Sequence, residues 1–436
     1  GMDTSVSSQP KIFYGWYIVA TCFFVAFLTV GARNCFGIFV IPMSEELGWN
    51  RTTISFAAAL GFLVNGVTQP FIGYMFDRLG GRMVITIGLV VMGVASVCLA
   101  FTFHFLFLVF VFSLVLSTAL SGPSLTNTMA LISKWFRSKR ATAVSLNSVG
   151  VSMGGLILVP FAMYFMQATD WRWTWAALGL VMLVLAVPLC LIFLRNDPSE
   201  KGLLPDGELD ISERNQEGRN KELLGEYEVS NWQDSFKTPP MWQLSGSYVV
   251  CGITTGTIST HFVPLAIDRG ASPSMAALIF GVMMGLNVFG GLGAGILSDK
   301  FKRKNILGTV YFMRGLAYVA LLVFPSTYGL WAFAITSGFS WVASVPLTSS
   351  LTADVYGLKA LGTISGVTFF CHQVGSFAMI LLAGYLFDVT GSYNIPFAIA
   401  GAFLFPAALS AFTIKETKYS SRYSYNVRET TSSMGY

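Results

Sequence analysis

The sequence predicts an all-α integral membrane protein: twelve transmembrane helices in two six-helix, pseudo-symmetric bundles. Three observations predict this fold, namely an apolar composition, twelve long apolar runs and a repeat that relates the two halves. Of the 436 residues, 54% are hydrophobic and 11% are charged, and the mean hydropathy is +0.63. An average soluble chain carries about 25% charged residues. The composition therefore favours a chain whose surface meets lipid.

Twelve apolar runs reach the length of about 20 residues that a membrane-spanning helix needs. They are too long for the strands of a membrane barrel. The expected spans are 13–41, 52–76, 83–103, 105–132, 141–167, 174–195, 241–267, 274–298, 306–324, 329–355, 361–388 and 393–415. They predict an N-terminal bundle at 13–195, a cytoplasmic linker at 196–240, a C-terminal bundle at 241–415 and a disordered cytoplasmic tail at 416–436.

The distribution of basic residues predicts the topology. Of the 27 Lys and Arg residues, Arg51, Arg172 and Arg269 fall in the expected outer loops, Arg33 and Arg314 fall inside spans, and the rest lie on the expected cytoplasmic side. Basic loops are retained in the cytoplasm, so we expect a multi-pass protein of the plasma (cell inner) membrane with both termini cytoplasmic. The net charge of +5 follows this topology, and we expect no nucleic-acid partner.

The second half of the chain repeats the first. Residues 42–82 align without gaps with residues 264–304, 222 positions later. Pro42 pairs with Pro264 and Asn65 with Asn287. Parallel repeats of this kind build transporters whose substrate site lies near the middle of the membrane, between the halves.

Two matched loops within the repeat read GYMFDRLGGR and GILSDKFKRK. They resemble the signature G-x-x-x-D-[KR]-x-G-[RK]-[RK] of the major facilitator superfamily, and the resemblance implies that superfamily's twelve-helix fold. A carboxylate at a helix end can pair with a cation or a helix terminus and release it on switching. The expected residues of such a conformational latch are Gly73, Asp77, Arg78, Arg82, Gly295, Asp299, Lys300 and Arg303.

Three further motifs resemble the monocarboxylate transporter family and its oxalate–formate antiporter relatives: YGWYIV (14–19), KWFRSKRATAVSLNSVG (134–150) and SMGG (152–155). The resemblance implies transport of a small organic anion. The chain departs from the family in the eighth span, where the family's Asp and Arg, four residues apart, are replaced by Asn287 and Gly291. This departure puts lactate-type proton symport in doubt and shifts the cationic role to Arg33.

Arg33 is the main candidate for binding an anion. Away from the span ends no Asp or Glu occurs within a span, so no acid is placed to pair with this guanidinium. A buried cation needs a partner, and a substrate carboxylate could supply one through two parallel hydrogen bonds. The resemblance also implies a role, because the monocarboxylate family has a functional lysine at the corresponding place. The alternative is a guanidinium satisfied by helix carbonyls or directed outward to water.

Three other ionisable groups lie within spans. Arg314 is expected to pair with Asp354, at the cytoplasmic end of the tenth span. His372 corresponds to a substrate-binding lysine of the oxalate–formate antiporter. It is either a neutral group bonded to a neighbour such as Gln373 or, when protonated, a second cation or proton carrier. His261 is a second proton-coupling candidate that could gate the outer mouth, or it merely faces outer water.

Further expected cavity-lining groups are amides and aromatic rings, each of which could instead be a packing residue. They are Asn34, Asn65, Gln69, Asn127, Asn147, Asn287, Trp341, Phe370 and Gln373. Asn65 and Asn287 could face the cavity from both halves, or could recur only because the halves are homologous.

These features predict a transporter of small organic anions, with monocarboxylates the first expectation, working by alternating access as a proton-coupled symporter or an anion exchanger. Efflux of amphipathic drug-like compounds is one alternative, and a non-transporting membrane sensor is another. Three scattered histidines supply no nucleophile–base set and no metal-ligand cluster, so we expect no enzyme, cofactor or metal. The expected partners are the anion, the lipid bilayer and, as a candidate, a proton, and we expect a monomer.

Overall fold

The computed structural model describes residues 12–136, 140–203, 227–356 and 361–415, and within these ranges every regular element is a helix. The six spans of the first half are α1 (Gly15–Asn34) with α2 (Phe36–Leu47); α3 (Arg51–Leu79); α4 (Gly81–Leu99); α5 (Phe105–Leu108), η1 (Val109–Leu116), α6 (Ser117–Leu120) and α7 (Leu125–Trp135); α8 (Arg140–Met153), η2 (Gly154–Leu158) and α9 (Val159–Ala168); and α10 (Trp171–Val181), η3 (Met182–Ala186) and α11 (Val187–Phe193). The tail proposed at 416–436 lies outside the described residues.

The six spans of the second half are α14 (Pro239–Asp268), α15 (Pro273–Lys300), α16 (Arg303–Val323), α17 (Thr327–Gly338) with α18 (Ser344–Tyr356), α19 (Leu361–Thr390) and α20 (Asn394–Phe412). Two short helices, η4 (Pro198–Lys201) and α13 (Trp232–Ser235), flank the undescribed part of the segment between the halves. The order of the elements is that of a twelve-helix fold made of two six-helix halves.

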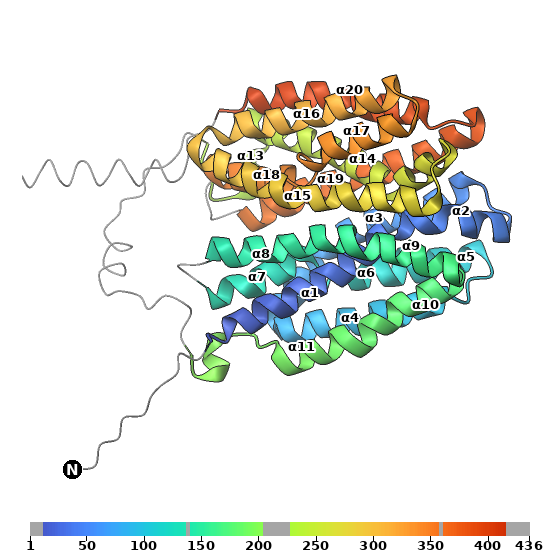
Figure 1. Ribbon diagram of the computed structural model, residues 1–436. Helices are drawn as coiled ribbons and strands as arrows, with labels where there is room; N and C mark the ends of the chain where they lie inside the picture. Colours follow the sequence, from blue (N-terminus) through green and yellow to red (C-terminus); the bar gives the residue numbers. More distant parts are fainter. Residues whose placement is uncertain (1–11, 137–139, 204–226, 357–360, 416–436) are drawn as a thin grey trace, which may run out of the picture.

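The two halves lie side by side, with α1–α11 in one and α14–α20 in the other (Figure 1). The start of α1, the end of α11 and the start of α14 lie at the same end of the molecule, which we call the linker end. The opposite end, where α2 and α5 lie, is called the far end. Across the halves α3 packs against α19, α2 against α14, and α8, η2 and α9 against α15.

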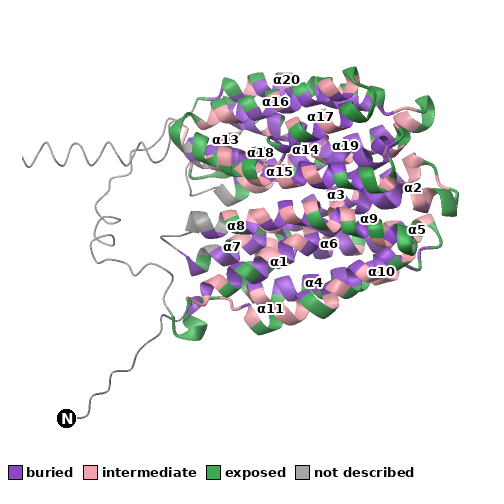
Figure 2. Cartoon of the chain, viewed as in Figure 1, coloured by how far each residue is buried: buried purple, intermediate pink, exposed green. Residues whose placement is uncertain are grey.

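The outside of the molecule is apolar. Exposed positions lie on the peripheral helices of both halves (Figure 2), and many carry large apolar side chains such as Phe110, Phe161 and Val184. An extended apolar surface of this kind matches lipid tails, and helices satisfy their own backbone hydrogen bonds there. The described chain contains eleven helical stretches that are long and apolar enough to cross a membrane.

The remaining span, the tenth, is divided by a break between α17 and α18. Arg314, on α16 and fully buried, donates to the carbonyl oxygens of Ser340 (2.8 Å) and Trp341 (2.7 Å) in this break. It also donates to the hydroxyls of Ser344 and Thr254. On the other side of the break, Val342 N donates to Asn287 Oδ1 at 2.9 Å. The freed backbone groups are therefore held by side chains of two neighbouring helices.

The expectation that Arg314 pairs with Asp354 is wrong. Asp354 accepts instead from Arg303 Nε, at 2.8 Å. The physical reason is that the break offers Arg314 two carbonyl oxygens at the C-terminal end of α17, where the helix dipole favours a cation. A neutral but oxygen-rich environment has taken the place of the predicted counter-ion.

Candidate functional site

The guanidinium of Arg33 has one face covered by an aromatic ring of its own half. Its Cζ is 3.9 Å from the centroid of the Phe62 ring on α3. Arg33 is partly exposed, and no residue in the described ranges forms a hydrogen bond or ion pair with its side chain. A guanidinium stacked on a ring keeps its N–H edge free for a planar acceptor such as a carboxylate.

Arg33 lies deep within the molecule and not at the far mouth. Phe62 comes eleven residues after Arg51, at which the 29-residue helix α3 begins at the far end. At 1.5 Å per residue this is about 17 Å along the axis. The guanidinium therefore lies near the middle of α3, at the level where a substrate between two halves would be bound.

The same turn of α3 is bonded to the other half through Gln373 of α19. Gln373 Nε2 donates to the carbonyl oxygen of Phe62 and to Asn65 Oδ1, both at 3.2 Å. A Cβ at Gly66 would lie 2.7 Å from Gln373 Cβ, so only glycine permits this approach. Asn65 in turn donates to Ser121 Oγ at 3.0 Å. Gln373 thus connects the Arg33–Phe62 pair with the second half.

His372 continues this path into the second half. Its Nδ1 lies 2.8 Å from Gln373 Oε1, an atom that only accepts, so Nδ1 carries a proton. Its Nε2 lies 3.3 Å from the hydroxyl of Thr255, which donates its proton to the Cys251 carbonyl oxygen at 2.8 Å. His372 thus links Gln373 of α19 with Thr255 of α14.

The other expected lining residues are divided between this region and two helix junctions. Asn34 and Phe370 are partly exposed or exposed. Asn127 donates to the carbonyl oxygens of Ser121 and Gly122, at the junction of α6 and α7. Gln69 donates to Ser124 Oγ at the same junction.

Asn147 and Trp341 are buried. Asn147 donates to Thr128 Oγ1 at 2.9 Å, and its Oδ1 has no recorded partner. Trp341 lies in the break of the tenth span, its ring 5.4 Å from the Cζ of Arg314. Asn287 holds the other side of the same break. The structure therefore places these three residues in helix contacts and groups Arg33, Asn65, His372 and Gln373.

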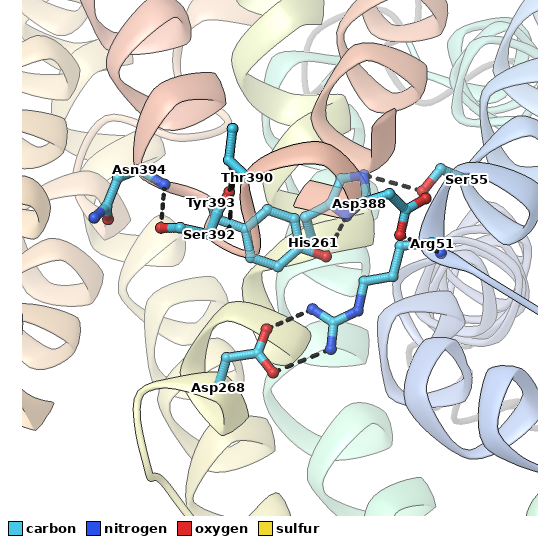
Figure 3. Close-up of polar contacts among 9 residues, drawn as sticks. All are labelled: Arg51, Ser55, His261, Asp268, Asp388, Thr390, Ser392, Tyr393 and Asn394. Carbon is cyan, nitrogen blue, oxygen red and sulfur yellow. Dashed lines mark hydrogen bonds and ion pairs between the residues drawn. The ribbon is translucent and has the colours of Figure 1, made fainter. Parts of the chain in front are cut away.

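We call the contact between the two halves, where α3 meets α19 and α2 meets α14, the seam. At the far end of the seam, charged side chains join the halves (Figure 3). Arg51, the first residue of α3, forms a two-pronged ion pair with Asp268 at the end of α14, with its NH2 3.0 Å from Oδ1. The Arg51 guanidinium also lies over the Phe387 ring, at 3.9 Å. Asp388, the next residue of α19, accepts from Arg51 N at 3.1 Å and from Thr52 N at 2.7 Å.

His261 lies in the same closed region and does not face outer water. It is fully buried, with Nδ1 2.9 Å from the Tyr393 hydroxyl and Nε2 2.9 Å from the Ile380 carbonyl oxygen. Nε2 also approaches Ser55 Oγ of α3, at 3.5 Å. Because a carbonyl oxygen only accepts, Nε2 carries a proton, and His261 links α14, α19 and the loop before α20.

At the linker end, the described contacts of the first copy of the expected latch lie within the first half. Asp77 is exposed, and no described residue bonds to it. Arg78 donates to Tyr74 Oη, and Arg82 donates to the carbonyl oxygen of Leu191, both within the first half. Among the described residues, no atom outside the local helix backbone lies within 4 Å of a Cβ placed at Gly73 or at Gly295.

In the second copy of the latch, the one ion pair described joins two residues of the second half. Arg303 pairs with Asp354, Lys300 is exposed, and the side chain of Asp299 lies outside the described part. In the described ranges, the polar bonds recorded between the two bundles run from the level of Gln373 to the far end. The described hydrogen bonds between the two bundles therefore lie between the level of Gln373 and the far end.

The sequence reasoning missed Phe62, Asp388 and the pairing of Arg51 with Asp268. Asp388 is the last residue of the expected span 361–388 and was assigned no role. The sequence did contain a usable signal. Arg51, Asp268 and Asp388 all lie at span ends on the same expected membrane face, an arrangement that could have indicated contacts among them. Phe62 had no such signal, since it is one of 37 phenylalanines.

Comparison with known proteins decides the family. The family model described as Major Facilitator Superfamily matches residues 22–380. The chain belongs to the major facilitator superfamily. It is a multi-pass membrane transporter, and the fold described above is that of this superfamily.

Similar proteins include transporters with and without an assigned substrate. The chain is 25% identical over 398 residues to the uncharacterized MFS-type transporter YcxA of Bacillus subtilis (strain 168), covering 89% of this chain and 92% of the relative. It is 26% identical over 433 residues to monocarboxylate transporter 12 of Rattus norvegicus, covering 93% and 86%.

Solved structures support the fold alone. A D-xylose–proton symporter superposes with a TM-score of 0.71 at 14% identity, covering 93% of this chain and 99% of that chain. A bacterial homolog of the human lysosomal transporter Spinster, in an inward-facing and occupied conformation, superposes with a TM-score of 0.68 at 16% identity, covering 93% and 97%.

Proposed function

We propose that this transporter carries small organic anions, monocarboxylates first among them, by alternating access between its two bundles. The observation that carries the proposal is Arg33: a guanidinium near the middle of α3, stacked on Phe62 and without a carboxylate partner among the described residues. A substrate carboxylate would supply the missing charge. The similarity to monocarboxylate transporter 12 supports the same substrate class.

Within this proposal, Arg33 binds the carboxylate, and Asn65, Gln373 and His372 form the polar wall beside it. Gln373 is bonded to both halves at this level. Binding of an anion at Arg33 would therefore affect the hydrogen bonds between α3 and α19. Asn34 and Phe370 remain candidates for contacts with the rest of the substrate.

In a proton-coupled mechanism, the proton is carried by one of the two histidines or by the substrate itself. His372 is the stronger candidate for carrying a proton because it is bonded to Gln373, which in turn contacts the carbonyl oxygen of Phe62 beside Arg33. Anion exchange suits the same site, since no carboxylate in it needs protonation. With the basic loops in the cytoplasm, the far end is the outer end, and the structure corresponds to an outward-closed state.

Uptake into proteoliposomes tests the proposal. We expect labelled lactate, pyruvate, formate or an aromatic carboxylate to be accumulated, and Arg33→Ala to abolish uptake of the active anion while Arg33→Lys retains part of it. Thermal-shift screening of small acids with the parent and Arg33→Ala proteins identifies the anion to label. An Arg33→Ala protein that transports the anion at the parental rate would overturn the role of Arg33.

The alternatives predict different outcomes in the same assays. A transporter of amphipathic drug-like compounds would move those compounds in both proteins and ignore the acids. A sensor would show a thermal shift with an acid but no counterflow of the labelled acid against an unlabelled pool.

A further inference from the structure

The N-terminus of α3 is completed by the other half of the protein. A helix begins with backbone N–H groups that have no partner within the helix. Asn50, which precedes α3 in the same half, accepts from Thr53 N at 2.9 Å. The two preceding groups, Arg51 N and Thr52 N, are bonded to Asp388 of α19 in the second half.

Asp388 also accepts from the Thr52 hydroxyl, so one carboxylate receives three donors from one turn of α3. Its negative charge lies at the positive end of the helix dipole. The side chain of Arg51, on the same turn, is directed to a second carboxylate, Asp268. Two acids of the second half thus hold the first turn of α3.

Asp388 itself is exposed, whereas the neighbouring ion pair is partly shielded from water. The side chain of Arg51 is 13% exposed, and it is covered by the rings of Phe387 and Tyr393, at 3.9 and 5.3 Å. One turn further along α3, Ser55 is fully buried, and a Cβ added at Gly384 of α19 would lie 2.3 Å from its Oγ. A shielded ion pair is worth more than a pair on the open surface.

We propose that Asp388 is a gating residue of this transporter: with the Arg51–Asp268 ion pair, it closes the far end by capping α3 across the two halves. The cap exists only while α3 and α19 are together. Opening of the far end leaves Arg51 N and Thr52 N without protein partners and separates Arg51 from Asp268. The proposal does not depend on which substrate the transporter carries.

The closure also lies on the same two helices as the candidate anion site. α3 carries Arg51 at one end and Phe62 near its middle, and α19 carries Asp388 and Gln373 at the matching levels. Because both helices are continuous between these points, separation at the far end and separation at Gln373 are parts of one movement. Opening of the gate therefore also changes the contact between Gln373 and Phe62 at the candidate anion site.

A buried reporter cysteine tests the gate. In Ser55→Cys protein in nanodiscs, labelling by a membrane-impermeant maleimide measures the fraction of time that the far seam is open. The protein without this change gives the background from the six native cysteines. Loss of a helix cap typically destabilises a helix end enough to shift an equilibrium about fivefold, so we expect Asp388→Ala to raise the labelling rate about fivefold. Arg51→Gln is expected to raise it as well.

The matched control is Asn50→Ala. It removes a cap from the same helix end but breaks no contact between the halves, so we expect the labelling rate to stay at the parental value. A parental rate in Asp388→Ala, or an equal increase in Asn50→Ala, would overturn the proposal. The thermal transition of each variant is measured in parallel, and an increase in labelling supports the gate only in variants that keep a cooperative transition.

Discussion

The guanidinium of Arg33 lies on the ring of Phe62, and the backbone carbonyl of the same Phe62 accepts a hydrogen bond from Gln373 in the opposite half. One residue of α3 thus contacts the candidate anion-binding group with its side chain and the second bundle with its backbone. Phe62 is therefore positioned to affect both anion binding and the contact between the bundles.

Replacement of Phe62 tests the side-chain part of this relationship. Phe62→Leu removes the ring that supports Arg33, and a cation–π contact of about 0.5–2 kcal/mol corresponds to roughly a 2- to 30-fold change in affinity. We expect the KM for the transported anion to rise within that range in initial-rate uptake measurements. Phe62→Tyr retains the ring and should remain near the parental KM. An unchanged KM in Phe62→Leu would show that the stacking of Arg33 on Phe62 does not contribute to anion binding.

His372→Gln tests coupling. If His372 carries the proton, the glutamine variant loses accumulation driven by a pH gradient, while exchange of labelled for unlabelled anion continues. Both fluxes are measured in the same proteoliposomes, with and without an imposed gradient. Undiminished pH-driven accumulation would assign the proton to another group or to the substrate, and the same pair of measurements on His261→Gln compares the second candidate.

Arg314→Met should destabilise the protein. The substitution leaves the carbonyl oxygens of Ser340 and Trp341 in the break without their donor, and each buried unsatisfied group costs about 1–3 kcal/mol. We expect a clear fall in the melting temperature in detergent. Lys237→Gln, which removes a pair between exposed side chains, should change it little. Equal melting temperatures for the two variants would show that Arg314 does not maintain the break.

Asn287→Asp should not recreate the acid that the monocarboxylate family carries in this span. Asn287 Nδ2 donates to the Met283 carbonyl at 3.2 Å, and Oδ1 accepts from Val342 N. An aspartate would place an acceptor against the Met283 carbonyl. We expect lower thermal stability and no gain in pH-driven uptake, measured beside Asn287→Ala. A stable variant with faster pH-driven uptake would contradict this.

Much of the fold could be predicted because lipid imposes a strict rule on sequence. Each span must be long, apolar and internally bonded, and the repeat relating Asn65 to Asn287 gave the relationship of the halves. The break in the tenth span was not predicted, because its maintenance by Arg314 and Asn287 is a property of packing between helices. Composition alone treats residues 329–355 as one apolar run.

The candidate site was predictable where charge was scarce. Arg33 stood out because few ionisable residues lie in the spans, and scarcity makes each one informative. Phe62 and Asp388 were not predicted, for opposite reasons. Phenylalanine is too common here to mark a site, and an acid at a span end has an ordinary explanation in water. Only their contacts across the seam distinguish them.

The break in the tenth span has an electrical consequence. Arg314 is held there by carbonyls, hydroxyls and the sulfur of Cys251, with no carboxylate among these partners, and Arg33 has no carboxylate partner among the described residues. The empty transporter would therefore carry uncompensated positive charge within the bilayer, and an anion bound at Arg33 would cancel part of it. Displacement of one elementary charge through the full field is worth about 2.3 kcal/mol per 100 mV. The return of the empty transporter should thus depend more strongly on membrane potential than the loaded step.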